Sequence, residues 1–229
     1  RLCHAKPPFF EKNYAKRTAK DYHIFRTIFF MSFLWSVVLP VTTLMYNLKV
    51  KGKENLPKKG NYMLASNHVS EMDPPFLACA CNMPIAFMAK KELFDKTEPR
   101  NWLVKKLGAF SVDREHPGIS TFKSAKEIFK TSWKLGIFPE GGTRKNKKIE
   151  NVHNGFVALA KAAKADIVPV SISGFDGYSK RLFEKHVTVT IGKPISYQLE
   201  TDEIVRLWCQ EISKNTGFEN CMLQEKSSC

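Results

Sequence analysis

One stretch of the sequence, from Thr27 to Leu48, contains no charged residue over 22 positions. At about 1.5 Å per residue, a helix of this length reaches across the hydrocarbon core of a bilayer. A core helix of a soluble domain is the alternative, but such helices seldom run so far without a charge, so the stretch favours membrane association. Pro40 interrupts the helical pattern. The segment therefore forms either a helix or a helical hairpin that bends at Pro40 and lies in one leaflet.

The charge of the chain favours an anionic membrane surface as a partner. Lys and Arg number 36 against 22 Asp and Glu, which gives a formal net charge of +14. Basic residues in 1–26 precede the uncharged stretch, and this arrangement favours the cytoplasmic face of a cell membrane. We expect residues 1–48 to form a basic and hydrophobic membrane-association segment, with a bacterial inner membrane as the favoured location. The sequence has no zinc-ligand spacing and no aromatic-glycine RNA-binding block, so we expect no nucleic-acid partner.

The remaining composition is that of a globular domain. Apolar residues make up 43% of the chain and charged residues 25%. The cysteines lack the spacing of a disulfide framework or of a zinc site, so we expect free thiols in a reducing compartment and no metal. There are six, at Cys3, Cys79, Cys81, Cys209, Cys221 and Cys229.

Short β-rich runs alternate with amphipathic stretches after residue 48, and this alternation predicts an α/β domain over 49–216. The expected strands are 49–51, 62–66, 85–89, 109–112, 136–138, 167–172 and 187–191. The expected helices are 74–81, 100–107, 119–133, 155–163 and 201–215. Periodicity is lost after this last helix, so we expect residues 217–229 to be a frayed C-terminal tail.

A polar cluster, Asn67 to Asp73, directly follows the expected strand 62–66. Asp73 precedes Pro74, a pattern typical of an N-cap with proline at the first helical position, so His68 falls in a strand-to-helix loop. On one helix, His68 and Asp73 would point about 140° apart, so they meet only if the chain turns. If they meet, Asp73 accepts a hydrogen bond from one imidazole nitrogen and the other serves as a base. The alternative is a capping Asp and a loop His that has only a structural role.

Three further blocks carry polar or unusual residues next to expected strands. The first ends in Asp113-Arg114, and the second runs from Phe138 to Arg144. The third, Val168 to Val170, places Pro169 inside a strand-like run, which predicts an edge strand or a special site.

In this order, the four blocks resemble those of the glycerolipid acyltransferase family, which includes 1-acylglycerol-3-phosphate acyltransferases. The Asn-His-x-Ser-x-x-Asp block of the family matches Asn67 to Asp73, and its block ending in Asp-Arg matches 113–114. Its Val-Pro-Val block matches 168–170. Its Phe-Pro-Glu-Gly-Thr-Arg block is similar to 138–144, although this chain has Gly141 and Gly142 where the family has one glycine. The extra glycine affects the placement of Thr143 and Arg144, and the neighbouring Lys145 is an alternative phosphate ligand.

The resemblance implies a mixed, mostly parallel β-sheet flanked by helices and preceded by the N-terminal membrane-associated helix or hairpin. It implies transfer of a fatty acyl group from a thioester to the free hydroxyl of 1-acylglycerol 3-phosphate (lysophosphatidic acid), which gives phosphatidic acid in phospholipid biosynthesis. The thioester is acyl-CoA or an acyl-carrier-protein conjugate, and no cofactor or metal is expected. His68 and Asp73 would form a general-base dyad.

The resemblance also assigns substrate-binding and supporting roles to other residues of the blocks. Guanidinium groups bind phosphate in a bidentate way, so Arg114 and Arg144 are the expected phosphate ligands. Glu140 is expected to orient an Arg or a glycerol hydroxyl. Oxyanion donors are expected from backbone N–H groups near the two glycines or in the helix after Pro75. The substrate-binding set is Arg114, Glu140, Gly141, Gly142, Thr143 and Arg144, and the structural or acyl-site set is Asn67, Ser70 and Pro169.

Two kinds of alternative remain open from the sequence. Within the enzyme class, the acceptor is another lysophospholipid, glycerol 3-phosphate or an amino-lipid. Outside it, the chain is a non-catalytic membrane lipid-binding protein of the same fold. Ser70 lacks the glycine frame of a nucleophile elbow, so we expect it to support the loop rather than to act as a nucleophile.

Overall fold

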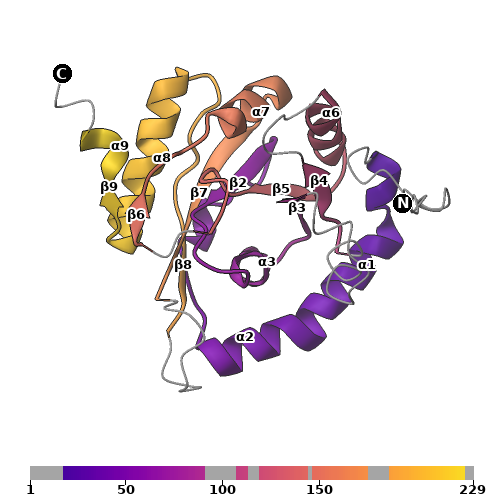
Figure 1. Cartoon of the computed structure of the whole chain (residues 1–229). Coiled ribbons are helices and arrows are strands. Elements are labelled where there is room, and N and C mark those ends of the chain that lie inside the picture. The colour runs from indigo at the N-terminus through magenta and orange to yellow at the C-terminus, as the bar shows by residue number, and fades with distance from the viewer. Residues whose placement is uncertain (1–17, 91–106, 113–118, 144–145, 175–185, 225–229) are drawn as a thin grey trace, which may run out of the picture.

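The computed structural model describes residues 18–90, 107–112, 119–143, 146–174 and 186–224. Within these residues, a seven-stranded β-sheet lies between two layers of helices (Figure 1). In sheet order the strands are β1 (Lys49–Lys51), β8 (Thr188–Ile191), β7 (Asp166–Ser173), β2 (Tyr62–Ser66), β5 (Lys134–Ile137), β3 (Ile85–Lys90) and β4 (Phe110–Val112). A second sheet pairs β6 (Lys148–Ile149) with β9 (Glu219–Asn220).

Helices cover both faces of the sheet. One face carries α3 (Asp73–Cys81), with α1 (Ile24–Phe33) and α2 (Leu39–Tyr46) outside it (Figure 1). The other face carries α6 (Ile119–Ile128), α7 (Gly155–Ala163) and α8 (Thr201–Thr216). The short elements are η1 (Ala19–Tyr22), η2 (Leu34–Val38), η3 (Lys53–Asn55) and α9 (Cys221–Gln224). The layering confirms the predicted α/β class.

Paired strands of the large sheet run parallel except for β7 and β8, which are antiparallel. The sheet is therefore mixed and mostly parallel, as expected. In the centre, Leu64 of β2 is in register with Gly136 of β5 on one side and with Val168 of β7 on the other. The strand after β2 in the chain is β3, but its place beside β2 is taken by β5, so the segments that follow β2 and β5 are neighbours in space.

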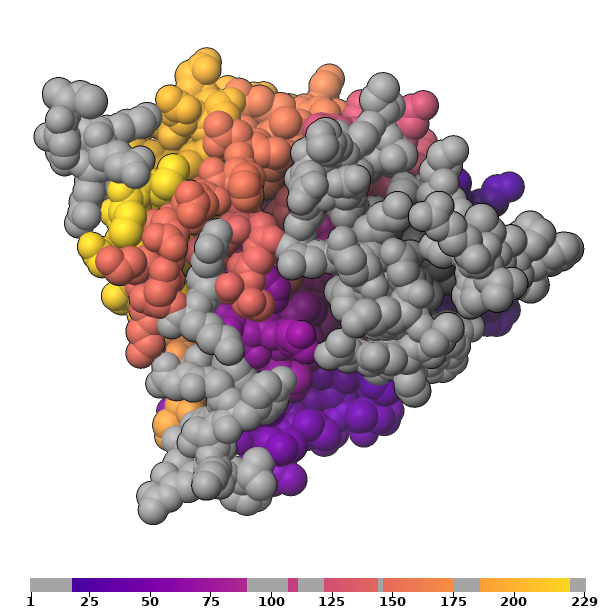
Figure 2. Space-filling model, in the orientation of Figure 1, coloured from indigo at the N-terminus to yellow at the C-terminus, as the bar shows by residue number. Residues whose placement is uncertain are grey.

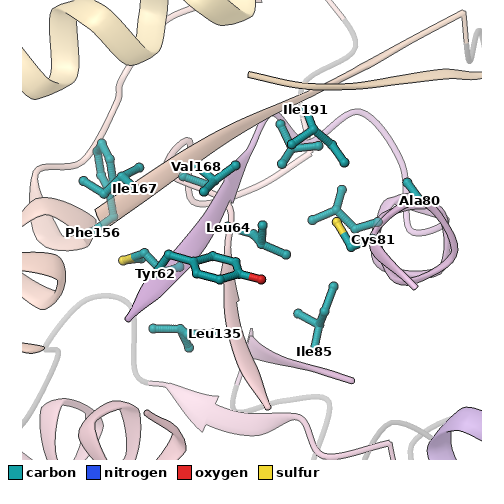
Figure 3. Close-up of a cluster of buried hydrophobic side chains, with 14 of the residues drawn as sticks. Tyr62, Leu64, Ala80, Cys81, Ile85, Leu135, Phe156, Ile167, Val168 and Ile191 are labelled. Atoms are coloured by element: carbon teal, nitrogen blue, oxygen red, sulfur yellow. The ribbon is translucent and has the colours of Figure 1, made fainter. Parts of the chain in front are cut away.

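The core fills both faces of the central strands (Figure 3). Leu64 and Ile191 point towards α3, where Cys81 is buried. Ile167 points to the opposite face and lies beside Phe156 of α7. Period-two alternation along each strand places apolar side chains on both faces, as expected for a sheet buried between helices. The described cysteines Cys79, Cys81, Cys209 and Cys221 are free thiols, as predicted.

Pro169 lies in β7, between β8 and β2, so the expectation of an edge strand is wrong. Its carbonyl accepts the N–H of Gly192 at 2.8 Å, just past the end of β8. Beyond Gly192, the next pairing with β7 is the isolated bridge between Ile167 and Ile195. The N–H that proline lacks therefore falls where the ladder is already interrupted, and the strand tolerates proline in the interior of the sheet.

Two helix and tail expectations also need correction. The helix expected over 119–133 ends at Ile128, because the Thr131 hydroxyl donates to the Ile128 carbonyl and accepts the Trp133 N–H, which turns the chain into β5. The tail expected to fray has structure over 219–224, where β9 pairs with β6 and α9 follows. The helix expected over 100–107 lies outside the described residues except at its last position.

The N-terminal apolar segment forms one continuous helix over Ile24–Tyr46, which at 23 residues is long and apolar enough to cross a membrane. It does not bend into a hairpin at Pro40. A π-helical turn, η2, precedes the proline, and the Leu39 N–H bonds the carbonyl of Leu34 five residues back. This wider turn accommodates the missing N–H of proline without breaking the helix.

One side of this helix packs on the domain. Phe30 contacts Trp133 with ring centroids 5.1 Å apart, and Tyr46 contacts Phe76 at 5.2 Å. At about 100° per residue, Tyr46 would lie about 160° around an α-helix from Phe30. Residues of the π turn rotate by less than about 100° each, which reduces this angle, so both rings face the domain. Other positions of the helix leave large apolar residues exposed, namely Ile24, Phe25, Ile28, Phe29, Trp35, Val37, Leu39, Val41 and Leu44. Of these, Trp35 donates its indole N–H to Asn82 at 2.9 Å.

Candidate active site

Two strand ends bring the candidate residues together. Asn67 to Asp73 follows β2, and Phe138 to Thr143 follows β5. Because β2 and β5 are parallel neighbours, both segments leave the sheet at the same edge. Crevices beyond the carboxyl ends of parallel strands are the usual binding sites of open α/β sheets.

His68 and Asp73 meet, because the chain turns between them. The imidazole Nδ1 lies 2.7 Å from Asp73 Oδ2, and the same oxygen accepts the N–H groups of Val69 at 2.7 Å and Ser70 at 2.8 Å. Asp73 is fully buried, and the His68 side chain is 13% exposed. With Nδ1–H donating to the carboxylate, Nε2 carries the free lone pair and has no partner among the described residues. The pair has the geometry of an oriented base.

Asp73 does not cap α3 as the sequence suggested. The helix begins at Asp73 itself, and the carboxylate turns back to the loop instead of bonding the first turn. The next two residues, Pro74 and Pro75, have no N–H, and the Phe76 N–H bonds the Met72 carbonyl at 3.1 Å. The first turn of α3 therefore has no free N–H for an oxyanion, so this expected source of donors is wrong.

Glu140 holds the backbone of the base in place. Its Oε2 accepts the His68 N–H at 3.1 Å, and its side chain is 2% exposed. The carboxylate also acts on α8. The pKa of the Cys209 thiol, in α8, is raised to about 12. Burial of the thiol is the larger cause, and the negative charge of Glu140 adds to it. His68 is thus fixed at two points, by its ring nitrogen and by its backbone.

An aromatic stack covers one face of the imidazole. The rings of His68 and Phe138 have centroids 4.0 Å apart and planes inclined by 18°. Phe87 of β3 stacks with Phe138 at 5.8 Å and 11°. Phe138 begins the block 138–144, but the sequence predicted no contact with the base for it or for Phe87. The available signal was the alternation that places Gly136 and Phe138 on one face of the segment, beside a strand that carries Phe87.

Asn67 and Ser70 stabilise the loop. The Asn67 amide donates to the Ile172 carbonyl at 2.9 Å and accepts the Ile172 N–H at 2.8 Å, so the side chain extends the pairing of β2 with β7 by one step. The Ser70 hydroxyl accepts the Met72 N–H at 3.1 Å. Both side chains are buried.

The loop that contains Gly141 and Gly142, called here the glycine loop, accommodates the extra glycine at the surface. Gly141 has φ +67 and donates its N–H to the Phe138 carbonyl at 3.0 Å. A side chain at Gly142 would meet nothing within 4 Å, and its N–H has no partner in the described part of the chain. Thr143 is exposed. Arg114 and Arg144 lie outside the described residues.

Comparison with known proteins gives consistent results. A protein-family model described as Acyltransferase matches residues 47–173. The chain is 36% identical to the 1-acyl-sn-glycerol-3-phosphate acyltransferase of Bacillus subtilis (strain 168), over 68% of this chain and 77% of that protein. It is 32% identical to the protein of the same name from Streptococcus pneumoniae (strain ATCC BAA-255 / R6), over 69% of this chain and 60% of that protein.

The fold is also similar to a solved structure. The crystal structure of the 1-acyl-sn-glycerophosphate (LPA) acyltransferase, PlsC, from Thermotoga maritima superposes with a TM-score of 0.64. The match covers 82% of this chain and 77% of that one at 23% sequence identity, so this likeness concerns the fold.

Proposed function

This chain belongs to the acyltransferase family, and from that premise we propose that it transfers a fatty acyl group from a thioester to the hydroxyl of 1-acylglycerol 3-phosphate, giving phosphatidic acid. The observation that carries the proposal is the His68–Asp73 pair at 2.7 Å. A hydroxyl is a poor nucleophile, so acyl transfer needs a base that is held in one tautomer and has an accessible nitrogen. The relatives named above support the choice of acceptor.

The proposed reaction uses direct attack. His68 Nε2 removes the proton of the acceptor hydroxyl as its oxygen bonds to the thioester carbonyl carbon, and the carbonyl electron pair moves to the oxygen. The tetrahedral intermediate then re-forms the carbonyl as the C–S bond breaks, and the imidazolium gives its proton to the departing thiolate. An ester and a free thiol result, and His68 returns to its neutral form. No cofactor beyond the thioester substrate enters these steps.

Asp73 and the glycine loop stabilise the charges that develop during these steps. The carboxylate of Asp73 stabilises the imidazolium that forms on His68. The oxyanion needs N–H donors, and the unpartnered N–H of Gly142 is the candidate that the loop offers. We assign the acceptor phosphate to Arg114 and Arg144, whose guanidinium groups suit bidentate binding. Glu140 acts by fixing the backbone of His68.

For membrane placement, we propose that the helix Ile24–Tyr46 lies in one leaflet, parallel to the surface. Contacts at Phe30 and at Tyr46 bind both halves of the helix to the domain, and this arrangement disfavours a spanning orientation. Its exposed side offers apolar residues to lipid, as in monotopic proteins. In Figure 2, this indigo and purple helix lies along the lower edge of the molecule, next to the magenta part of the chain around residues 60–80.

Exposed basic residues follow the helix in the chain. Leu44 is 67% exposed near the end of α2, and exposed lysines follow directly. They are Lys49, Lys51, Lys53, Lys58 and Lys59. Each Lys near an anionic bilayer contributes on the order of 1 kcal/mol of attraction, so the cluster favours a negatively charged leaflet, which we place at the cytoplasmic face of a bacterial cell membrane.

The experiment that tests the function supplies acyl-CoA or acyl carrier protein thioesters to the purified full chain in detergent micelles. The acceptors are lysophosphatidic acid, another lysophospholipid and glycerol 3-phosphate, and products are read by mass spectrometry. We expect phosphatidic acid as the main product. A product formed mainly from another acceptor would replace the proposed one, and absence of product from every pair would favour the non-catalytic alternative.

A further inference from the structure

We propose that the face of the Phe138 ring stabilises the imidazolium that forms on His68 during transfer, and that Gly136 and Phe87 hold this ring in place. The inference rests on the proposed function, because it concerns the same base. It assigns Phe138 the role of a positioning and charge-stabilising residue, which acts on the reaction through His68.

The contact has the geometry that this role requires. The two ring planes are inclined by 18° with centroids 4.0 Å apart, so the imidazole lies over the face of the phenyl ring and not at its edge. Phe138 is 9% exposed, so water does not screen the contact strongly. The His68 ring is held against it from two further directions, through Nδ1 by Asp73 and through the backbone by Glu140.

The stack favours the charged state over the neutral state of the base. The face of a phenyl ring carries negative potential, which attracts a cation within about 6 Å of its centroid. His68 is neutral when the substrates bind and positive while it holds the hydroxyl proton. An attraction that grows between these two states lowers the barrier of the chemical step and not the dissociation constant of the substrate. The stack therefore contributes to kcat rather than to KM.

Gly136 provides the space that Phe87 occupies. A Cβ at Gly136 would lie 2.6 Å from Phe87 Cε1 and 2.7 Å from Ile85 Cγ2, closer than such atoms approach. Gly136 and Phe87 are in register on adjacent strands, so the Phe87 ring lies across the backbone of β5. From there it stacks with the ring of Phe138. The sequence of contacts runs from Gly136 through Phe87 and Phe138 to His68.

The alternative is that Phe138 only fills space beside the base. Ring fluorination separates the two roles, because each added fluorine weakens the negative potential of the ring face and leaves the ring nearly unchanged in size. We would replace Phe138 with mono-, di- and trifluorophenylalanine in the full chain and measure single-turnover acyl transfer to lysophosphatidic acid, together with KM. The same replacements at Phe156, a buried residue of α7 on the other face of the sheet, are the control.

We expect the single-turnover rate to fall stepwise with fluorine number, by about 3- to 30-fold in total, with KM unchanged. The Phe156 series should show no trend. Phe138→Tyr, which keeps the ring face, should retain more activity than Phe138→Leu at equal thermal stability. A rate independent of fluorination at position 138 would overturn the assignment.

The support by Gly136 has its own test, a double-mutant cycle of Gly136→Ala and Phe87→Leu. Each single variant should lower the single-turnover rate, and the combined loss should be smaller than the product of the two, because both act through the same ring. Losses that multiply would show that the two residues act independently. Failure of the proposed function is distinguishable, since it would appear as an inactive wild type, whereas failure of this inference leaves the wild type active and the variants unaltered.

Discussion

The backbone N–H of His68 donates to Oε2 of Glu140 at 3.1 Å, and this contact joins the loop after β2 to the loop after β5. The two residues are 72 positions apart in the chain. Glu140 therefore determines where the imidazole lies relative to whatever the β5 loop binds. Its carboxylate is buried, so removing it leaves an N–H without an acceptor in a low-dielectric environment.

Glu140→Ala should lower the free energy of unfolding by about 1–3 kcal/mol, since a buried hydrogen bond to a charged group is lost. It should also lower kcat by about 10- to 100-fold, because the base is displaced. Glu140→Gln retains an acceptor oxygen and should recover part of both losses. Thermal unfolding and initial rates in detergent measure the two effects. A Glu140→Gln variant no better than Glu140→Ala would show that the charge, and not the hydrogen bond to His68, is what matters.

Asp73→Asn should lower kcat by about 10³- to 10⁴-fold, the loss typical of an orienting aspartate replaced by its amide. The amide oxygen can take the place of the carboxylate oxygen that bonds His68, Val69 and Ser70, but it carries no negative charge to stabilise the imidazolium. Initial rates check this, with Asp166→Asn as the isosteric control at the opposite end of the sheet, where it should leave kcat unchanged. A loss of less than tenfold at Asp73 would remove it from the dyad.

Ile28→Glu and Leu44→Glu place a charge on the exposed side of the N-terminal helix. Each should weaken binding to anionic phosphatidylglycerol vesicles by at least about tenfold, because an apolar contact with lipid is replaced by a charge that resists insertion. Thermal stability should not fall, since neither side chain packs on the domain. Gln210→Glu, an exposed change of equal charge on α8, is the control for sedimentation with vesicles. Unaltered binding of both helix variants would contradict the one-leaflet placement.

Alkaline pH should destabilise the fold through its buried thiols. Burial raises the pKa of Cys81 from its ordinary value of 9.0 to about 12. Between these values the unfolded thiol loses its proton and the folded one keeps it, so stability is complete below pH 9 and falls as pH rises towards 12. The loss is on the order of 1 kcal/mol by pH 10. Melting temperatures at pH 8 to 11 should decline less steeply in Cys81→Ala than in the wild type, and parallel declines would contradict this origin.

The sequence predicted most of what local patterns determine. Strands such as β2 and β7 appear within one residue of their expected bounds. Short apolar runs bounded by turn residues are typical of buried strands. The contact between His68 and Asp73 was also predictable. A strand that ends at residue 66 and a helix start marked by Pro74 require the chain to turn between the two residues. What these residues do in catalysis stays a prediction until activity is measured.

The parts that the sequence could not predict depend on contacts between distant segments. Pro169 fits an interior strand because the pairing of β8 is interrupted past Gly192, which no local pattern around the proline reveals. The pairing of β6 with β9 joins two-residue strands that carry no periodicity. Likewise, Glu140 and Phe138 reach His68 because β5 lies beside β2 in the sheet. The residues of either segment alone do not indicate this strand order.

The most direct test of the account compares wild type with His68→Ala in the transfer of an acyl group from its thioester to lysophosphatidic acid. Both proteins are first matched for melting temperature and vesicle binding, so that a difference in rate reports the chemical step. The account predicts phosphatidic acid from the wild type and a loss of at least about 10³-fold in the variant. Residual activity of His68→Ala within tenfold of the wild type would contradict the assignment of His68 as the base.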